Sequence, residues 1–380
     1  MPNRIITSIL FATVATAATV ANTEFTDSLK TPELNNQNVT ATNCAHRLFT
    51  TSKSFDMIAS LQYFNKIKER PQFSHLAADS AFMSELNTIN DNVSASKLCN
   101  LYASFGGNRH DTDSCVVFFT LLAENNDVIK YDESWVNNIV NLSPQISSCL
   151  SAINNAGYSE YWVSDIKPVI DGYINSYPVS EKALNAIHDA MTEFSGPEIL
   201  PPTHSNIYIL NIDNAFNLSD ESFCCTPILL NTEFEKKFRL DFLKVYIHEN
   251  LHRLSISGEL MNRLDELMAD DFYHENENVA RSHNEGRNEA FVVAAEVFIS
   301  HKIGRRDNRS VYNEFKEYVD GSLVLAPIIY IHLHDKQEAE SLNDFILRLF
   351  DNGTIKTGYV KTAYDKAMSR LETAIPQTEI

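Results

Sequence analysis

Apolar residues recur close to helical spacing through the first half of the chain. The clearest run includes Phe55, Ile58, Ala59, Leu61 and Phe64. Apolar side chains at such intervals share one face of a helix, so the run predicts an amphipathic helix. Similar runs follow over residues 74–89, 95–105, 135–142 and 146–153. The first half is therefore expected to form a mostly helical lobe.

The pattern changes beyond a Gly-Pro pair at 196–197 and a Pro-Pro pair at 201–202. Residues 206–212 are rich in β-branched residues, which favours a strand, and residues 226–231 could form a second one. An exposed edge of the first strand could pair with an extended peptide. The second half is thus expected to contain a small sheet.

Helical patterns dominate the rest of the chain. A long one covers residues 232–254, and Gly258 is expected to mark its end. Residues 270–288 are polar and acidic, which is typical of a loop. Apolar helical patterns then return over residues 289–301, 311–318 and 340–350. The predicted fold class is α+β, predominantly α-helical.

The N-terminal residues have the composition of a secretory signal peptide. Arg4 supplies a positive charge, and residues 5–20 are uncharged and apolar or small. The triplets 15–17 and 19–21 both consist of small residues that suit signal cleavage. We expect a signal peptide over residues 1–21 and a secreted or periplasmic protein with no membrane span after its removal. An uncleaved anchor is the alternative.

The remaining chain is expected to divide where the pattern changes. Residues 22–44 are polar and rich in Asn and Thr, which indicates a flexible leader. Residues 45–195 are predicted to form the helical N-terminal lobe, and residues 196–375 a second region, which the motif described below predicts to be a metal-binding catalytic region. One continuous domain over residues 45–375 is the alternative.

Charge and cysteine content narrow the choice of partners and compartment. The 380 residues include 31 basic and 50 acidic ones, a formal net charge of −19. Such a surface repels phosphate backbones and anionic lipid, so neither nucleic acid nor acidic membrane is an expected partner. An even number of cysteines in an exported chain favours disulfide bonds, although the sequence selects no pairing. The cysteines are Cys44, Cys99, Cys115, Cys149, Cys224 and Cys225.

The segment His248-Glu249-Asn250-Leu251-His252 lies inside the predicted long helix. Histidines four residues apart lie on one face of a helix, so both ring nitrogens can bind one metal ion. Glu249 leans to the side of that ion, where its carboxylate could accept a proton from an activated water. Two ordinary helix histidines are the alternative interpretation.

A catalytic zinc ion needs a third protein ligand. Ser255 and Gly258 stand where a metzincin would have Gly and His, which excludes that family. Glu289 is favoured because it begins the apolar run 289–298, where a carboxylate is costly unless paired or metal-bound. Glu296, two turns further along, could instead be the ligand or a hydrogen-bond acceptor for either histidine. Other carboxylates in this segment are Glu259, Asp265, Glu266, Asp270 and Glu285. A solvated glutamate at a helix start is the ordinary interpretation of Glu289.

The motif formed by His248, Glu249 and His252, followed by an apolar helix that begins at Glu289, resembles the gluzincin group of zinc metallopeptidases. The layout is similar to bacterial exported HExxH domains of unassigned activity. In these a downstream Glu-x-x-x-x-Ala helix supplies a carboxylate, and Glu289 and Ala294 match it. The resemblance implies a zincin-like catalytic region that binds one zinc ion through His248, His252 and Glu289, with Glu249 as general base. The long segment between the two motifs departs from many gluzincins.

The sequence thus predicts an exported zinc metallopeptidase that hydrolyses a peptide or protein substrate. The alternatives are a metal-assisted hydrolase of a non-peptide amide or ester, and a non-enzymatic exported binding protein with a structural metal. Stabilisation of the oxyanion could come from Tyr273, His274, His283 or Tyr359. His332 and His334 could form a weak second metal site on a strand, although a solvated turn is favoured.

Overall fold

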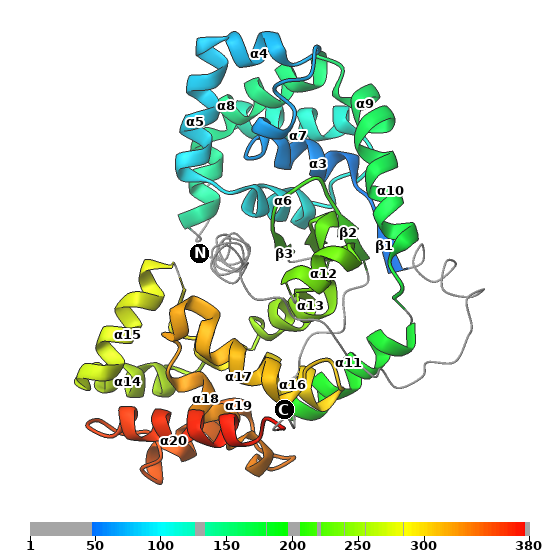
Figure 1. The fold of residues 1–380 in the computed structure, drawn as a ribbon. Helices are drawn as coiled ribbons and strands as arrows, with labels where there is room; N and C mark the ends of the chain where they lie inside the picture. The colour runs from blue at the N-terminus through cyan, green and yellow to red at the C-terminus, as the bar shows by residue number, and fades with distance from the viewer. Residues whose placement is uncertain are drawn as a thin grey trace. The chain divides into compact units, whose positions relative to one another are not determined.

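The computed structural model describes residues 48–125, 134–179, 181–196, 206–218, 222–238, 240–254, 256–283 and 285–376. These residues form two compact units, each treated by itself below (Figure 1). The first unit takes the described residues up to 178 together with those from 206 to 234. The second takes the described residues from 179 to 196 and from 235 onward. The predicted signal peptide and leader, residues 1–44, lie outside the described residues.

The first unit is mostly helical, as its apolar pattern predicted. Asp79 begins α5 by accepting hydrogen bonds from two backbone N–H groups of its first turn, and Asp111 begins α7 in the same way. Helices α5 and α7 both pack against α8. The helices are α3 (Lys53–Ser60), η1 (Phe64–Lys66), α4 (Ser74–Ala78), α5 (Ser80–Asn92), α6 (Ala95–Ser104), α7 (Thr112–Glu124), α8 (Ser134–Asn155), α9 (Tyr158–Tyr161), η2 (Trp162–Ile166), α10 (Lys167–Ser176) and η3 (Pro227–Leu230).

A small mixed sheet of four strands belongs to the first unit, in the order β1-β2-β4-β3. The strands are β1 (Phe49–Thr50), β2 (Asn206–Ile209), β3 (Ala215–Asn217) and β4 (Ser222–Cys225). β2 runs parallel to both β1 and β4, and β3 is antiparallel to β4. The predicted strand near residue 206 is therefore confirmed, but it is internal. Pairing of its edge with a peptide was wrongly predicted, because β1 and β4 occupy its two sides.

The predicted strand over residues 226–231 is wrong, because this segment forms the 3-10 helix η3. The Thr226 side chain accepts a hydrogen bond from the N–H of Ile228, and Pro227 stands at the first helical position. Both features favour the start of a helix. Pro227 also has no N–H to donate to a neighbouring strand, which disfavours the predicted strand.

Asp56 ties the sheet to the helices of the first unit. Its two carboxylate oxygens accept hydrogen bonds from Trp162 Nε1 at 2.7 Å and from the N–H of Asn211 at 2.5 Å. Nearby, the rings of Phe55 and Tyr208 meet edge to face, with their centroids 5.2 Å apart. These buried contacts explain why the segment after residue 206 packs with the first half of the chain.

The second unit consists of helices. They are α11 (Glu181–Ser195), α13 (Phe242–Leu251), α14 (Gly258–Leu267), α15 (Asp271–Ser282), α16 (Glu289–Lys302), α17 (Asn308–Glu317), η4 (Tyr318–Gly321), α18 (Leu325–Tyr330), η5 (Leu333–Asp335), α19 (Leu342–Asp351) and α20 (Val360–Thr373). α16 is buried along most of its length against α11, α13, α17 and α18, so it is the core helix of this unit. That position explains why its sequence is apolar on nearly every side.

Three sequence predictions fail in and around the second unit. The single helix over 232–254 is two helices, α12 (Thr232–Phe238) and α13, because Asp241 accepts a hydrogen bond from the N–H of Lys244 and starts a new helix. Gly258 begins α14 after the cap residue Ser257, rather than ending a helix. The expected loop over 270–288 contains α15, which Asp270 caps in the same way.

The two compact units also divide the chain differently from the predicted lobes. α11 was assigned to the N-terminal lobe, but it packs against α13 and α16. The strands from residue 206 onward were assigned to the catalytic region, but β2 pairs with β1, and β4 and β3 extend the same sheet within the first unit. The observed fold class is α-rich with a small mixed sheet, which confirms the predicted α+β class at this coarser level.

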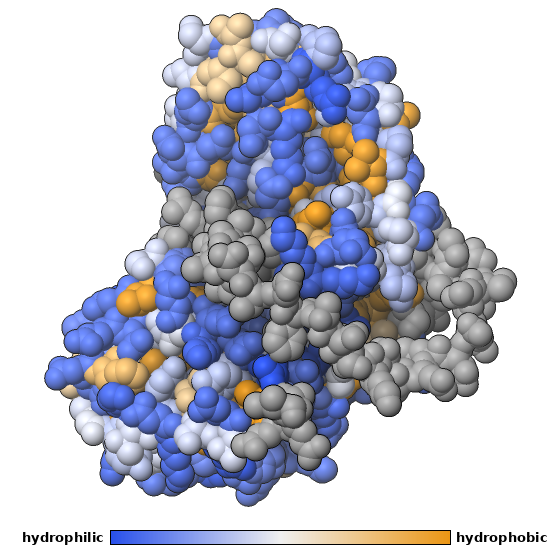
Figure 2. Space-filling model, viewed as in Figure 1, coloured by the Kyte–Doolittle hydropathy of each residue, from blue (hydrophilic) through white to orange (hydrophobic). Residues whose placement is uncertain are grey.

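The surface and the cysteines add little to this picture. Figure 2 shows a mostly hydrophilic face on each unit, with small separate apolar patches. None of the described helices combines the length and apolar character needed to cross a membrane. No disulfide joins any two of the five described cysteines, which are all buried: Cys99, Cys115, Cys149, Cys224 and Cys225. Cys44 lies outside the described residues.

Candidate metal centre

Helix α13 carries the HExxH motif and is buried along its whole length. The predicted geometry is present: His248 and His252 stand one turn apart, with ring centroids 4.8 Å apart. Their Nε2 atoms are 3.1 Å apart. Two imidazole nitrogens at this distance either share a proton or direct both lone pairs towards a common cation. The helix therefore presents a pair of nitrogen donors at one point.

Glu289, the first residue of α16, completes a group of three. Its Oε1 lies 3.3 Å from His248 Nε2, and its Oε2 lies 3.5 Å from His252 Nε2. One ligand atom from each residue lies within 4.8 Å of the others, so the group could hold a metal ion. α13 and α16 pack directly against each other, which brings residues some forty positions apart in sequence together. The predicted third ligand thus lies beside the two histidines.

The donor distances suit a small tetrahedral ion. Around a zinc ion with bonds of about 2.0–2.1 Å, tetrahedral donors lie roughly 3.4 Å apart. The three separations between donor atoms, 3.1, 3.3 and 3.5 Å, lie on both sides of this value. Two imidazoles and one carboxylate leave a fourth position open, as in catalytic zinc sites. The side chain of His252 is 17% exposed, so the group is not wholly closed to solvent.

Burial keeps both histidines in the neutral form, which is the form that can bind a cation. It lowers the pKa of His248 well below its ordinary value, and the neighbouring His252 and Arg306 lower it further. Burial also lowers the pKa of His252 to about 4. Both rings are therefore neutral near pH 7, and a neutral ring nitrogen is the form that binds metal. The close contacts of the two imidazole rings with the Glu289 carboxylate are accordingly not ion pairs.

The carboxylates experience the opposite effect. Burial raises the pKa of Glu289 to about 7, against the lowering effect of a hydrogen bond from Tyr318. Burial raises the pKa of Glu249 well above its ordinary value, and the nearby charge of Glu289 adds to the effect. Glu249 is only 3% exposed. A cation at the centre would reverse this preference and favour both ionised forms.

Tyr318 is a residue of this centre that the sequence did not reveal. Its hydroxyl donates a 3.0 Å hydrogen bond to Glu289 Oε1 and so orients the third ligand. The backbone immediately after it is left-handed at Val319 (φ 51°) and Asp320 (φ 56°). A buried β-branched residue in this region costs about 1–3 kcal/mol, and such strain tends to occur at functional sites. No motif marks Tyr318, because tertiary packing alone brings it to α16.

We expect the substitution Tyr318→Phe to weaken zinc binding roughly 10–100-fold, the usual effect of removing a partner that orients a metal ligand. The ring would remain, so the fold should be retained. Competition with a chromophoric chelator measures the affinity. Tyr312→Phe, the same change on α17, is the control and should leave affinity unaltered. Equal affinities for the two variants would contradict an orienting role for Tyr318.

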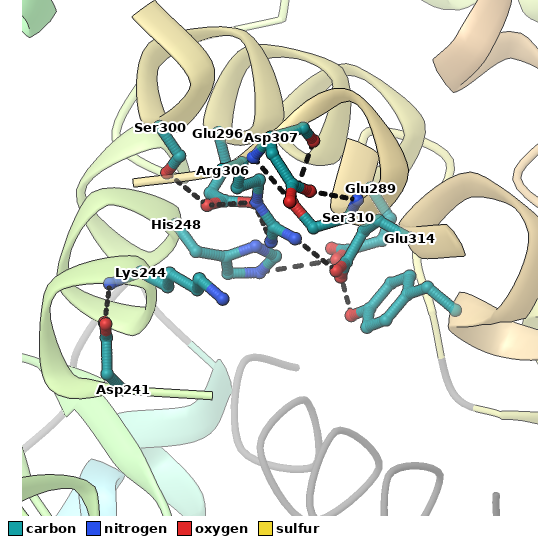
Figure 3. Close-up of polar contacts among 11 residues, drawn as sticks. Asp241, Lys244, His248, Glu289, Glu296, Ser300, Arg306, Asp307, Ser310 and Glu314 are labelled. Atoms are coloured by element: carbon teal, nitrogen blue, oxygen red, sulfur yellow. Dashed lines mark hydrogen bonds and ion pairs between the residues drawn. The ribbon is translucent and has the colours of Figure 1, made fainter. Parts of the chain in front are cut away.

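Glu296 takes part in a buried ionic network (Figure 3). Its Oε2 accepts a 2.8 Å hydrogen bond from Arg306 Nη2, and its Oε1 accepts one of 2.6 Å from Ser300. Arg306 also donates to Glu314 Oε2 at 2.5 Å. These contacts therefore do not support Glu296 as the third ligand, nor as a hydrogen-bond acceptor for either histidine. Sequence reasoning also missed Arg306.

The other candidate residues are engaged elsewhere. Asp270 caps α15, and Asp265 pairs with Arg287. The hydroxyl of Tyr273 contacts Glu277 at 3.5 Å, and His283 Nε2 lies 2.9 Å from Asp320 Oδ2. None of these contacts brings Tyr273 or His283, two of the expected oxyanion-stabilising residues, to the centre. Among the described residues, the group with metal-site spacing does not include Glu259, Glu266 or His274. Tyr359 stands at the start of α20.

His332 and His334 lie at the 3-10 turn η5, not on a strand. Each is within 4.0 Å of Asp335, at 3.7 and 3.4 Å. Among the described residues, the only group with the spacing of a metal site is the one formed by His248, His252 and Glu289. The favoured interpretation of these two histidines as a turn is consistent with the structure.

Comparison of the chain with protein-family models, with curated proteins and with solved structures found no match. The function must therefore be argued from the site itself.

Proposed function

We propose that the chain is a zinc-dependent metallopeptidase of the gluzincin type, with a zincin-like arrangement of its catalytic helices. The observation that carries the proposal is the convergence of His248, His252 and Glu289 beside the buried carboxylate of Glu249. Two imidazoles with one carboxylate suit zinc better than magnesium or calcium, which prefer oxygen ligands alone. A closed structural site would need a fourth protein ligand, and the group found among the described residues has three.

The residues fit the chemistry that hydrolysis of an amide requires. When bound, zinc lowers the pKa of a coordinated water towards neutrality and polarises a substrate carbonyl. Glu249 accepts the proton that the attacking water loses, and it returns that proton to the nitrogen of the leaving amine. His248 and His252 stay neutral throughout, because burial disfavours their charged forms. Tyr318 holds Glu289 in one orientation.

The proposal extends to the predicted export of the protein and its action on peptides or proteins. An exported peptidase acts on substrates outside the cytoplasm. The net negative charge of the chain repels nucleic acid, so it favours other kinds of partner. The amino-terminal segment that would direct export lies outside the described residues.

Removal of the metal tests the proposed function. We expect 1,10-phenanthroline to reduce hydrolysis of a denatured fluorescent protein more than tenfold, and added zinc to restore it. The isomer 1,7-phenanthroline has the same rings but does not chelate, so it should have no effect. Hydrolysis that is equally fast with both isomers, or a purified protein that contains no zinc, would contradict the proposal.

A further inference from the structure

A third carboxylate lies near the candidate centre and has no place in the proposed mechanism. Glu285 lies in the turn between α15 and α16, four residues before Glu289. It is 3% exposed, and neither of its carboxylate oxygens has a hydrogen-bond partner among the described residues. Its charge interacts with those of Glu289 and Glu249 and acts on Tyr318, so it lies close to the centre.

Burial, and then the charges of Glu289 and Glu249, raise the pKa of Glu285 to about 9, so the carboxyl alone is neutral near pH 7 and a cation beside it would stabilise its ionised form. A divalent ion would balance two of the three carboxylates Glu249, Glu285 and Glu289, and both histidines are neutral. With all three ionised, one negative charge is left among them. Arg306, whose charge acts on His248, is committed to Glu296 and Glu314, and Arg287, two residues after Glu285, is committed to Asp265 and Glu277.

The chemistry of Glu285 favours an organic cation over a second metal ion. Among the described residues, the group with metal-site spacing does not include Glu285, so its carboxylate does not converge with other ligands around a small ion. A protonated amine needs less: a single carboxylate can accept one of its three N–H donors, and the others can bind water or substrate. Peptides carry such amines at their N-terminus and on lysine side chains.

We propose that Glu285 binds a protonated amine of the substrate beside the scissile bond. The inference rests on the proposed peptidase function and deepens it, because it gives that site a preference for positively charged substrates. The amine could come from two sources, the N-terminal ammonium of a peptide or the side chain of a lysine. An N-terminal ammonium lies two bonds from the first peptide carbonyl, whereas a lysine ammonium lies at the end of a four-carbon chain.

Three ligands that reach zinc through a hydroxamate separate these sources without requiring turnover. They are leucine hydroxamate, N-acetyl-leucine hydroxamate and N-acetyl-lysine hydroxamate, acetylated in both cases on the α-amine so that the lysine side chain keeps its charge. Binding is measured by calorimetry on zinc-loaded protein at neutral pH. We expect one of the two cationic ligands to bind roughly 10–100-fold more tightly than N-acetyl-leucine hydroxamate, as a charged hydrogen bond would produce. Tighter binding of leucine hydroxamate identifies the N-terminal ammonium, and tighter binding of N-acetyl-lysine hydroxamate identifies the side chain.

The variant Glu285→Gln should remove this preference, bringing the ratio of dissociation constants close to one while zinc content stays at one ion per chain. Glu259→Gln, on the exposed face of α14, is the matched control and should keep the wild-type ratio. Equal affinities for all three ligands on zinc-loaded wild type, which needs no variant, would overturn the inference. So would a ratio unchanged in Glu285→Gln, or a second zinc ion that this variant loses.

Zinc content distinguishes this failure from that of the proposed function. A wild-type protein that binds no zinc refutes the metallopeptidase and the inference that depends on it. A protein that binds one zinc ion and cleaves peptides, yet shows no preference for amines, refutes only the role of Glu285.

Discussion

Replacing Glu249 with glutamine is expected to lower kcat by roughly 10²–10⁴-fold, the usual contribution of a general base, while zinc stays bound. Glutamine has nearly the same shape but cannot accept a proton at neutral pH. The variant leaves the proposed zinc ligands His248 and His252 unchanged, so zinc affinity should change little. The measurements are initial rates on a fluorescent peptide and zinc content by atomic absorption, made on the same preparation.

The stability of this variant offers an independent check. Burial raises the pKa of Glu249 well above its ordinary value, so the metal-free fold already favours a neutral side chain at this position. The amide should therefore be tolerated, and thermal unfolding of the metal-free variant should match that of wild type. Glu275→Gln on the exposed surface of α15 is the control for rate. A Glu249→Gln protein with full activity would remove Glu249 from the role of base.

Local geometry explains why the centre of the site was predictable from sequence. A separation of four residues on a helix fixes the relation between His248 and His252 whatever the rest of the fold does. Glu289 was found by a different argument, that a carboxylate within an apolar helix needs a partner. The same argument also left Glu296 as an alternative, and the structure separates the two, because Arg306 pairs with Glu296 and the histidines lie beside Glu289.

Contacts made by tertiary packing were out of reach of the sequence. Tyr318 donates a hydrogen bond to Glu289 and is followed by a left-handed turn at Val319. No local preference of valine predicts this backbone conformation. The parallel pairing of Phe49 with Ile207 joins a strand of two residues to one far along the chain. A pair of residues carries no usable periodic signal.

Polar composition also misled the prediction for α15. Its buried residues are Tyr273, Glu277 and Ala280, so the middle of its inner face is a glutamate rather than an apolar side chain. Glu277 is tolerated there because Arg281 Nε donates to it at 3.0 Å and Arg287 lies within 3.6 Å. A search for apolar spacing passes over a helix whose inner face includes an ion pair.

Removing each of the two glutamates on α16 is expected to have opposite consequences. Glu289→Ala should weaken zinc binding more than 100-fold, because it deletes a ligand, and loss of a residue that merely orients a ligand already costs roughly 10–100-fold. The metal-free fold should lose little, since burial raises the pKa of Glu289 to about 7 and its charge is not needed there. Equilibrium dialysis against zinc and urea unfolding in chelator measure the two effects.

Glu296→Ala should instead destabilise the protein by about 3–5 kcal/mol, because it leaves Arg306 buried with only part of its compensation. Arg306 would keep its hydrogen bond to Glu314, which places the expected loss towards the lower end of that range. Zinc affinity, measured below the temperature at which this variant unfolds, should stay within a few-fold of wild type. The reverse outcome, in which Glu296→Ala loses zinc and Glu289→Ala unfolds, would exchange the roles of the two carboxylates. It would then be Glu296 that completes the metal centre, and the packing of α13 against α16 would have to differ from the arrangement described above.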